Sequence, residues 1–217
     1  AKIAEDSFVI DASSPIFASV SDFLEWKPAS PDSGYAPALR AITLYQGLLA
    51  FHRRDKDRSA FYDADLARLV YARNVAVGED KEARFKAALE RFIDQTSRHE
   101  ISARAQAILA QQLKDEGEPL KARALAQKAR KAFPQSSGAK ECANLILELE
   151  AKSAEVETEY VWSAPWPTID VTYRNTSKVY FRAVSADFLT HLQDESWYND
   201  QRRKQILEKT PALSWNS

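Results

Sequence analysis

The sequence predicts a mainly α-helical chain that closes with a β portion, and two patterns carry this prediction. Between residues 35 and 150, Ala, Leu and aromatic residues recur at intervals of three and four, the spacing of one helix face. From 167 to 184, the stretch PTIDVTYRNTSKVYFRAV instead alternates apolar and polar residues, which is typical of half-buried strands. We therefore expect an antiparallel stack of helical hairpins followed by antiparallel strands.

The composition is that of an ordinary globular chain. Of 217 residues, 45% are hydrophobic and 28% are charged, and the net charge is −1. Because 30 Lys and Arg are balanced by 31 Asp and Glu, no bulk field attracts a polyanion, and nucleic acid is not an expected partner. No apolar run approaches the roughly 18 residues that would span a bilayer. The single cysteine, Cys142, cannot form an internal disulfide.

The first 34 residues are expected to be irregular. SFVIDASSPIFASVSDFLEW mixes β-branched residues with Ser and Asp, and KPASPDSG (27–34) is typical of a loop. A helix is then predicted to begin at Pro37, because proline is tolerated in a first turn. Its apolar face is marked by three residues at helical spacing: Ile42, Tyr45 and Leu49. RRDKDR (53–58) carries both charge signs, which favours a solvated loop over a binding patch.

Two helix pairs of similar layout follow, 63–76 with 80–96 and 101–116 with 119–133. In the second pair, small, large, turn and stop residues fall where a tetratricopeptide repeat places them: Ala110, Leu113, Gly117, Ala122, Ala129 and Pro134. Small residues let two helices approach, glycine permits the tight turn, and proline ends a helix. The first pair matches less well, so we predict a tetratricopeptide-like stack rather than a regular array.

A last helix, 138–150, is expected to cap this stack, which makes residues 1–152 the predicted helical-repeat domain. Pro165 and Pro167 then exclude helix and favour an extended segment.

The remaining residues, 153–217, are predicted to form an incomplete β domain. Strands 168–173 and 178–184 are expected to pair as a hairpin around RNTS, where Asn175 tolerates a positive φ. Residues 187–210 have a helix-like pattern, and PALSWNS is expected to begin another strand.

Several stretches resemble bacterial proteins of the alpha-2-macroglobulin family. AFPQSSGAKECANLI and VETEYVWSAPWPTIDVTYRNTSKVYFRAV are similar to the region that leads into the first macroglobulin domain of a large multidomain lineage. YQGLLAFH and DADLARLVYARNVAVGEDK resemble its preceding helical part. The resemblance implies that the strands belong to a seven-stranded macroglobulin-type sandwich with a helical insertion near 187–210.

The same resemblance implies a role in protease trapping. Members of the family are cleaved in a bait region, close around the attacking protease, and in many cases couple to it through an internal thioester. Bacterial members are typically exported to the periplasm or the cell surface, often with a lipid anchor. The thioester needs a Gln three residues after its Cys, whereas Leu145 stands three residues after Cys142. Cys142 is therefore interpreted as a small buried hydrophobe.

No other catalytic, metal or cofactor site is predicted. His52, His99 and His191 are scattered, and we expect none of them to belong to a metal site. With five glycines in the chain, a phosphate-binding loop is not expected, and no Gly-x-Ser-x-Gly elbow occurs. The chain is therefore predicted to be non-catalytic.

Four aromatic residues gather at the predicted domain junction: Tyr160, Trp162, Trp166 and Tyr173. Packing of the first strand against the last helix is the favoured interpretation, because aromatic residues dominate such cores. The alternative is a surface on which a peptide or sugar stacks. QRRKQ (201–205) is locally basic but is flanked by acidic residues, which indicates an exposed helix with ion pairs.

The leading hypothesis is that the chain is the N-terminal positioning or docking segment of an exported alpha-2-macroglobulin-like protease trap. Proteases would then be partners of the downstream parts, and a protein partner could bind the helical stack. The alternative is a freestanding tetratricopeptide-like scaffold that holds a partner's peptide in its concave groove. A third hypothesis is a secreted glycan-binding module that uses the junction tryptophans.

Overall fold

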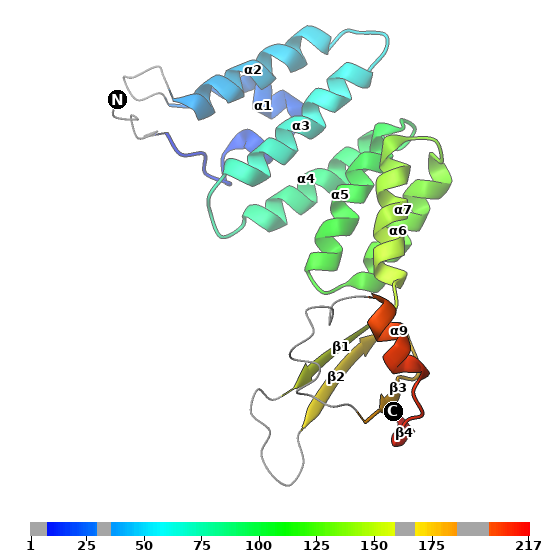
Figure 1. The fold of residues 1–217 in the computed structure, drawn as a ribbon. Coiled ribbons are helices and arrows are strands. Elements are labelled where there is room, and N and C mark those ends of the chain that lie inside the picture. Colours follow the sequence, from blue (N-terminus) through cyan, green and yellow to red (C-terminus); the bar gives the residue numbers. More distant parts are fainter. Residues whose placement is uncertain (1–7, 30–35, 159–167, 186–199) are drawn as a thin grey trace. The chain divides into compact units, whose positions relative to one another are not determined.

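The structure is a computed structural model that describes residues 8–29, 36–158, 168–185 and 200–217. The chain divides into two compact units, Ala1–Leu149 and Glu150–Ser217 (Figure 1). As predicted, it is mainly helical with a smaller portion of antiparallel strands. In the described residues, no helix is long and apolar enough to cross a membrane.

The first unit is a succession of helices. In chain order these are η1 (Pro15–Phe17), α1 (Val20–Glu25), α2 (Pro37–His52), α3 (Ser59–Val75), α4 (Lys81–Gln95), α5 (Ile101–Asp115), α6 (Pro119–Ala132) and α7 (Ser137–Glu150). Pro37 and Pro119 occupy the first helical position of α2 and α6, as the sequence predicted for Pro37. The predicted pairs correspond to α3 with α4 and α5 with α6, and residues 53–58 form the loop before α3.

Residues 1–34 were expected to be irregular, and in the described part of that segment this was wrong for Pro15–Phe17 and Val20–Glu25, which are helical. Helix α1 begins after Ser19, whose hydroxyl oxygen accepts the N–H of Asp22. Asp11 forms an isolated parallel β-bridge with Val77, the residue before Gly78. In this bridge the N–H of Ala12 donates to the Val77 carbonyl, and the N–H of Val77 donates to the Ile10 carbonyl. The segment also contributes several buried side chains to the core: Ile10, Ala12, Ile16, Phe17 and Phe23.

Alanine and glycine set the close helix packing that the sequence predicted. Ala110, Ala122, Ala126 and Ala129 are all fully buried where α5 packs against α6. Without longer side chains between them, the two backbones approach closely. Gly117 adopts φ +80° in the turn that joins these helices, a conformation that glycine reaches without steric cost.

Gly138 allows an even closer approach between α7 and α5. A Cβ atom built on Gly138 would lie 2.2 Å from the backbone N of Arg104 and 2.4 Å from the carbonyl C of Ala103. No real Cβ tolerates such distances, so only glycine fits at this position. The predicted cap of the stack is thus held against α5 at its first turn.

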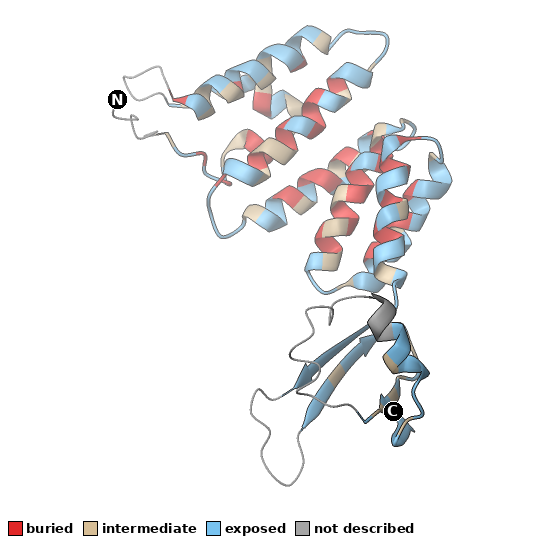
Figure 2. Cartoon of the chain, in the orientation of Figure 1, coloured by how far each residue is buried: buried red, intermediate tan, exposed pale blue. Residues whose placement is uncertain are grey.

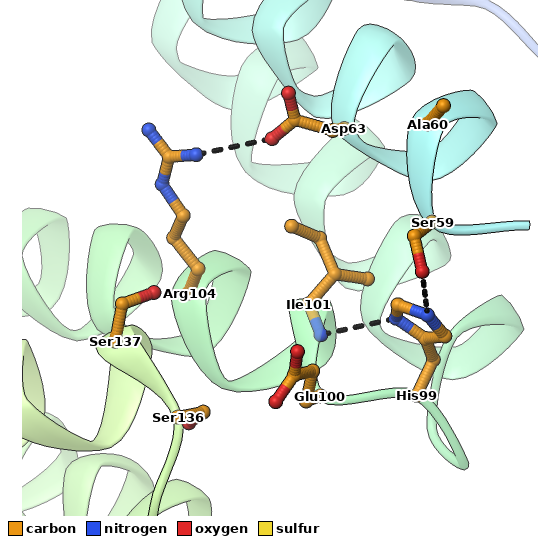
Figure 3. A pocket seen from close by; sticks show the side chains of 9 residues that line it. All are labelled: Ser59, Ala60, Asp63, His99, Glu100, Ile101, Arg104, Ser136 and Ser137. Atoms are coloured by element: carbon orange, nitrogen blue, oxygen red, sulfur yellow. Dashed lines mark hydrogen bonds and ion pairs between the residues drawn. The ribbon is translucent and has the colours of Figure 1, made fainter.

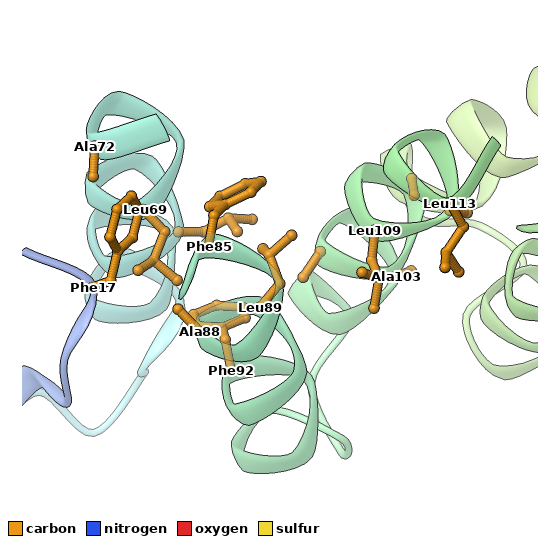
Figure 4. Close-up of a cluster of buried hydrophobic side chains, with 14 of the residues drawn as sticks. Phe17, Leu69, Ala72, Phe85, Ala88, Leu89, Phe92, Ala103, Leu109 and Leu113 are labelled. Carbon is orange, nitrogen blue, oxygen red and sulfur yellow. The ribbon is translucent and has the colours of Figure 1, made fainter. Parts of the chain in front are cut away.

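One continuous apolar core runs through the first unit. In Figure 2 the buried residues follow the inward sides of successive helices. Figure 4 shows part of this core, where Phe17, Leu69 and Phe85 come together from η1, α3 and α4. The rings of Phe17 and Phe85 lie 6.2 Å apart, centroid to centroid. The N-terminal segment is therefore part of the packing of the repeat helices.

The second unit contains four described strands and one described helix. They are β1 (Ser153–Thr158), β2 (Ile169–Arg174), β3 (Tyr180–Ala183), α9 (Asp200–Glu208) and β4 (Leu213–Asn216). The strands form two separate two-stranded antiparallel sheets, β1 with β2 and β3 with β4. The strand expected in PALSWNS is β4.

The predicted hairpin between 168–173 and 178–184 was wrong. Both segments are strands, but β2 pairs with β1, with Val171 opposite Val156, and β3 pairs with β4. Asn175 has φ +57°, as expected, yet its side-chain amide donates to the carbonyl of Ala151. Through this hydrogen bond, Asn175 contacts the residues just before β1, and it does not form the turn of a hairpin between β2 and β3.

Candidate functional site

Two clefts lie along α3 and α5 and meet at Arg104. The first, of about 350 Å³, is lined by Ser59, Ala60, Asp63, His99, Glu100, Ile101, Arg104, Ser136 and Ser137 (Figure 3). The second, of about 310 Å³, is lined by Tyr45, Leu66, Ala67, Val70, Tyr71, Asn74, Arg104 and Ile108. Arg104 lines both clefts, and we call the two clefts together the α3–α5 groove.

The local sequence explains why side chains from two helices line this groove. On α3, residues Asp63, Ala67, Val70 and Asn74 recur at the spacing of one helix face. Helix α5 is buried over most of its circumference, and Arg104 is its exposed residue within the groove. A helix so surrounded presents only the stripe that its neighbours leave open.

An ion pair crosses the groove where the two clefts meet. The Nη1 atom of Arg104 lies 3.2 Å from Oδ1 of Asp63, and both side chains are about half exposed. Figure 3 shows the guanidinium reaching from α5 towards the Asp63 carboxylate on α3. An exposed pair of this kind contributes little to stability, about 0–1 kcal/mol. Both charges therefore remain accessible to a ligand in the groove.

Asp57, Ser59 and His99 lie together at one end of the groove and contain the residue types of a hydrolytic triad. The N–H of Ile101 donates to Nδ1 of His99 over 3.2 Å, so this nitrogen carries no proton. The ring proton is then on Nε2, 3.1 Å from Ser59 Oγ, and the Ser59 hydroxyl donates to Asp57 Oδ1 over 2.6 Å.

This order of donors is the reverse of that in a serine nucleophile, where the imidazole accepts the hydroxyl proton. The Ser59 hydroxyl and N–H both donate to Asp57, and the hydroxyl bond is the larger cause of the lowered pKa of that carboxyl. The geometry gives no support to catalysis by Ser59. It instead fixes the first turns of α3 and α5.

The same end of the groove contains three helix starts, and each has a partner within the chain. Asp57 accepts the N–H of Ser59 in α3, His99 accepts the N–H of Ile101 in α5, and Ser136 Oγ accepts the N–H of Ala139 in α7. These bonds satisfy donors that a bound anion would otherwise use. At each of these helix starts, one of the donors that an anion could use is therefore already bonded within the chain.

The second cleft is more apolar and carries an aromatic pair. The rings of Tyr45 and Tyr71 lie 5.5 Å apart at an angle of 44°, and burial raises the pKa of Tyr45. Val70 and Ile108 are half-buried beside them, and Asn74 is exposed at the edge. An apolar floor with an amide and an ion pair at its rim suits an extended peptide, because a peptide offers both side chains and backbone hydrogen-bonding groups.

Sequence reasoning missed a buried ion pair within α3. Arg68 donates through Nε and Nη2 to Asp65 Oδ1, at 2.9 and 2.6 Å, and both residues are at least 95% buried. Burial raises the pKa of Asp65, while the guanidinium of Arg68 opposes that rise. Arg68 also donates to the carbonyls of Ile16 and Ala18, so the pair anchors the N-terminal segment.

The environment of the cysteine agrees with the sequence analysis, and that of His52 adds a contact that the sequence analysis did not name. Cys142 is fully buried on α7, and burial raises the pKa of its thiol to about 11, consistent with its interpretation as a buried hydrophobe. Sequence reasoning overlooked Asp55, three residues after His52, whose Oδ2 lies 2.7 Å from His52 Nδ1. In the described residues, no group of three or more His, Cys, Asp or Glu could hold a metal ion. His191 lies outside the described residues.

Most of the predicted junction aromatics also lie outside the described residues, namely Tyr160, Trp162 and Trp166. Tyr173 is described: it lies in β2, opposite Ala154 of β1, and is 41% exposed. Among the residues that line the α3–α5 groove, the sequence analysis had named Tyr45, as part of a helix face, and His99. The spacing of Asp63, Ala67, Val70 and Asn74 along one helix face was the available signal for the α3 side.

Comparison with known proteins gave no match to any protein-family model, curated protein or solved structure.

Proposed function

We propose that this chain is a non-catalytic docking segment of an exported, alpha-2-macroglobulin-like protease trap, and that the α3–α5 groove is its docking site. The single observation that carries the docking role is the groove itself, an accessible surface on otherwise buried helices. The resemblance of the sequence to bacterial alpha-2-macroglobulins supports the assignment to a trap. On this proposal the segment acts in the periplasm or at the cell surface.

The second unit supports the proposal because its described strands form small, uncovered sheets. β1 and β2 form a two-stranded sheet, and no described residue between 150 and 217 is buried. Two-stranded sheets are marginal in water unless further strands or helices cover them. A macroglobulin-type sandwich would supply such strands, so these sheets fit the first strands of that domain.

The chemistry of the groove indicates an extended protein segment as its ligand. The apolar cleft beside Tyr45 and Tyr71 would take an apolar or aromatic side chain. Arg104 and Asp63 would pair with charges of the ligand, and the amide of Asn74 would bond to its backbone. The groove therefore positions a partner or a neighbouring part of the trap, and does no chemistry on it.

The trapping role is tested with the protein that contains this segment. It is mixed with an active protease, and cleavage of a large protein substrate and of a small peptide substrate is followed side by side. We expect cleavage of the large substrate to fall while the small peptide is still cleaved, because a caged protease keeps its active site. Unchanged cleavage of both substrates would contradict trapping.

The same groove also favours the second candidate function, a freestanding scaffold that binds a partner's peptide. The two are separated by groove variants. Val70→Asp is expected to abolish peptide binding under either function, whereas Leu147→Asp, at a 69% exposed position of α7, supplies the control. Peptide binding that depends on Val70, in a protein that does not cage proteases, would favour the scaffold.

A further inference from the structure

Helix α6 carries charge of one sign only. Its 14 residues include five Lys and Arg and no Asp or Glu, whereas α4 mixes both signs along its length. The helix dipole explains Arg130 and Lys131, which lie in the last turn, but not the other three cations. The outward side of α6 is therefore a local positive surface on a chain whose net charge is −1.

The exposed residues of α6 follow a seven-residue repeat. A central line runs along the helix at the spacing i, i+4, i+7 and i+11, which keeps its members on one face. The line consists of Leu120, Ala124, Gln127 and Lys131, all of them exposed. Leu120, at the start of the line, is 82% exposed.

Two rows of cations border this central line. Lys121 and Lys128 form the row on one side, and Arg123 and Arg130 form the row on the other. The members of each row are seven residues apart, so they lie about two helical turns, or about 10.5 Å, from each other. All four are exposed. We call the central line and its two rows together the basic face of α6.

Little within the chain neutralises the basic face. Lys121 Nζ lies 2.5 Å from Glu118 Oε2, a surface pair that contributes about 0–1 kcal/mol. In the described part of the chain, Lys128, Arg130 and Lys131 form no ion pair. Lys128 and Lys131 are three residues apart on the helix, a spacing at which like charges repel. An anionic partner would relieve this repulsion.

The basic face has the pattern of one helix of a coiled coil. In such a pair the residues of the central line pack against the partner, and the charges on both sides of it choose the partner. A second α6 is not that partner, because its cations would oppose the cations here. The complementary helix carries Asp or Glu in both of its flanking rows.

Other polyanions fit the basic face less well. A membrane-bound amphipathic helix inserts its apolar side into the lipid, but the apolar side of α6, formed by Ala122, Ala126 and Ala129, is buried where α6 packs against α5. Single-stranded nucleic acid stacks its bases on aromatic side chains, and the basic face contains none. Leu120 and Ala124 instead offer apolar contacts that suit the side chains of a helix.

We propose that the basic face of α6 binds an acidic amphipathic helix of a partner protein. Leu120 and Ala124 contact the apolar residues of that helix, and the two rows of cations pair with its carboxylates. Because both rows have the same sign, these pairs form whichever way the partner helix runs. No α6 residue lines the α3–α5 groove, so the proposal does not rest on the function of the groove.

The test measures fluorescence anisotropy of a labelled peptide of about 21 residues, or three heptads, with Leu along its central line and Glu in both flanking rows. We expect the full chain to bind this acidic peptide with a Kd of about 10–100 μM. Raising the salt from about 0.05 M to about 0.5 M should weaken binding at least about 5-fold. A peptide with Lys in place of every Glu should not bind.

Paired charge reversals locate the binding surface. Arg123→Glu with Lys128→Glu reverses one cation in each row and should weaken binding at least about 10-fold, because two attractions become repulsions. Arg53→Glu with Arg54→Glu, in the loop after α2, is the matched control and should change the Kd by less than about 2-fold. Each reversal lowers the net charge by two, so both double variants carry −5 in place of −1. Circular dichroism verifies that both remain helical.

Two further probes define the kind of partner. The acidic peptide with a Pro in its central heptad cannot form a continuous helix and should bind at least about 10-fold more weakly. Vesicles of phosphatidylglycerol should not retain the chain on sedimentation. Failure of the acidic peptide to bind, equal losses in the two double variants, equal binding of the Pro peptide, or binding to the vesicles through Arg123 and Lys128 would overturn the inference.

Discussion

The two units of this chain differ in how they bury their side chains. In the helical unit, apolar residues from every helix and from the N-terminal segment join one continuous core. Among the described residues of the second unit, none is buried, and the strands form two sheets of two strands each. The first unit is thus held by its own packing, whereas each described strand of the second pairs with a single neighbour.

This difference shows what each kind of element needs from its surroundings. Helices satisfy their backbone internally, so small residues such as Ala122 and Gly138 suffice to bring two of them into contact. A two-stranded sheet leaves two edges open and needs a covering layer. We therefore expect substitutions of buried residues in the helical unit to lower the free energy of unfolding strongly, and substitutions in the strands to have small effects that do not reach the helices.

The largest effect is expected at the buried ion pair. Arg68→Met leaves the Asp65 carboxylate buried without its partner and removes both donors to the carbonyls of Ile16 and Ala18. Breaking a buried pair in this way costs about 3–5 kcal/mol. Urea denaturation followed by far-ultraviolet circular dichroism measures the loss. Arg104→Met, which removes an exposed pair, is the matched control and should cost at most about 1 kcal/mol.

Equal, small losses for the two arginine variants would show that the N-terminal segment does not depend on Arg68.

The next effect is expected where α7 meets α5. Gly138→Ala places a Cβ within 2.2 Å of the Arg104 backbone, so the helices must separate. Overpacking of this kind costs about 1–3 kcal/mol, and more where backbone atoms collide. The same denaturation experiment applies.

Gly47→Ala is the matched control for Gly138, because open space surrounds it on α2. It should stabilise the unit by about 0.5–1 kcal/mol, since alanine favours the helix. Identical changes in the free energy of unfolding for Gly138→Ala and Gly47→Ala would rule out the close contact between Gly138 and α5.

A smaller effect is expected in the second unit. The rings of Phe181 in β3 and Trp215 in β4 are stacked, 5.2 Å apart at 10°. Trp215→Ala should weaken the pairing of these strands by about 0.5–1.5 kcal/mol. Amide exchange of β3 is expected to accelerate, while the denaturation midpoint of the helical unit stays at its wild-type value. A lower midpoint would mean that the two units share stability.

The smallest effect is expected from an exposed ion pair between α4 and the end of α5. Lys86 Nζ lies 2.6 Å from Glu116 Oε2, and this contact lowers the pKa of the Glu116 carboxyl from 4.5. A carboxyl whose pKa is lower in the folded than in the unfolded state stabilises the protein at pH values above its unfolded pKa. This stabilisation is lost as the pH falls through the folded pKa. Glu116→Gln should therefore flatten the loss of stability below pH 4.5. Glu79→Gln, in the exposed turn after Gly78, is the control.

The sequence was most informative where structure depends on neighbours along the chain. Helix starts at Pro37 and Pro119 and the turn at Gly117 follow from local preferences, and the structure has them. The sequence did not predict the structure of the N-terminal segment, because that structure depends on distant residues. The side chains of Arg68 and Arg91 donate to carbonyls more than 50 residues earlier in the chain.

The prediction of strand pairing was wrong for the same reason, namely that it depends on distant residues. Pairing of β3 with β4 joins residues 30 to 36 positions apart, whereas the short polar turn after β2 favoured a local hairpin. The groove was expected only as part of the scaffold alternative, without its residues. Arg104 and Tyr71 lie on different helices, and no local pattern places them together.

Hydrogen exchange of the whole chain, followed residue by residue, tests the contrast between the two units most directly. We predict two protection classes: amides of α3 to α7 exchange only on global unfolding of the helical unit, and amides of β1 to β4 exchange orders of magnitude faster through local opening. A single class of protection that spans both units would contradict the account, because the strands would then share the stability of the helical core.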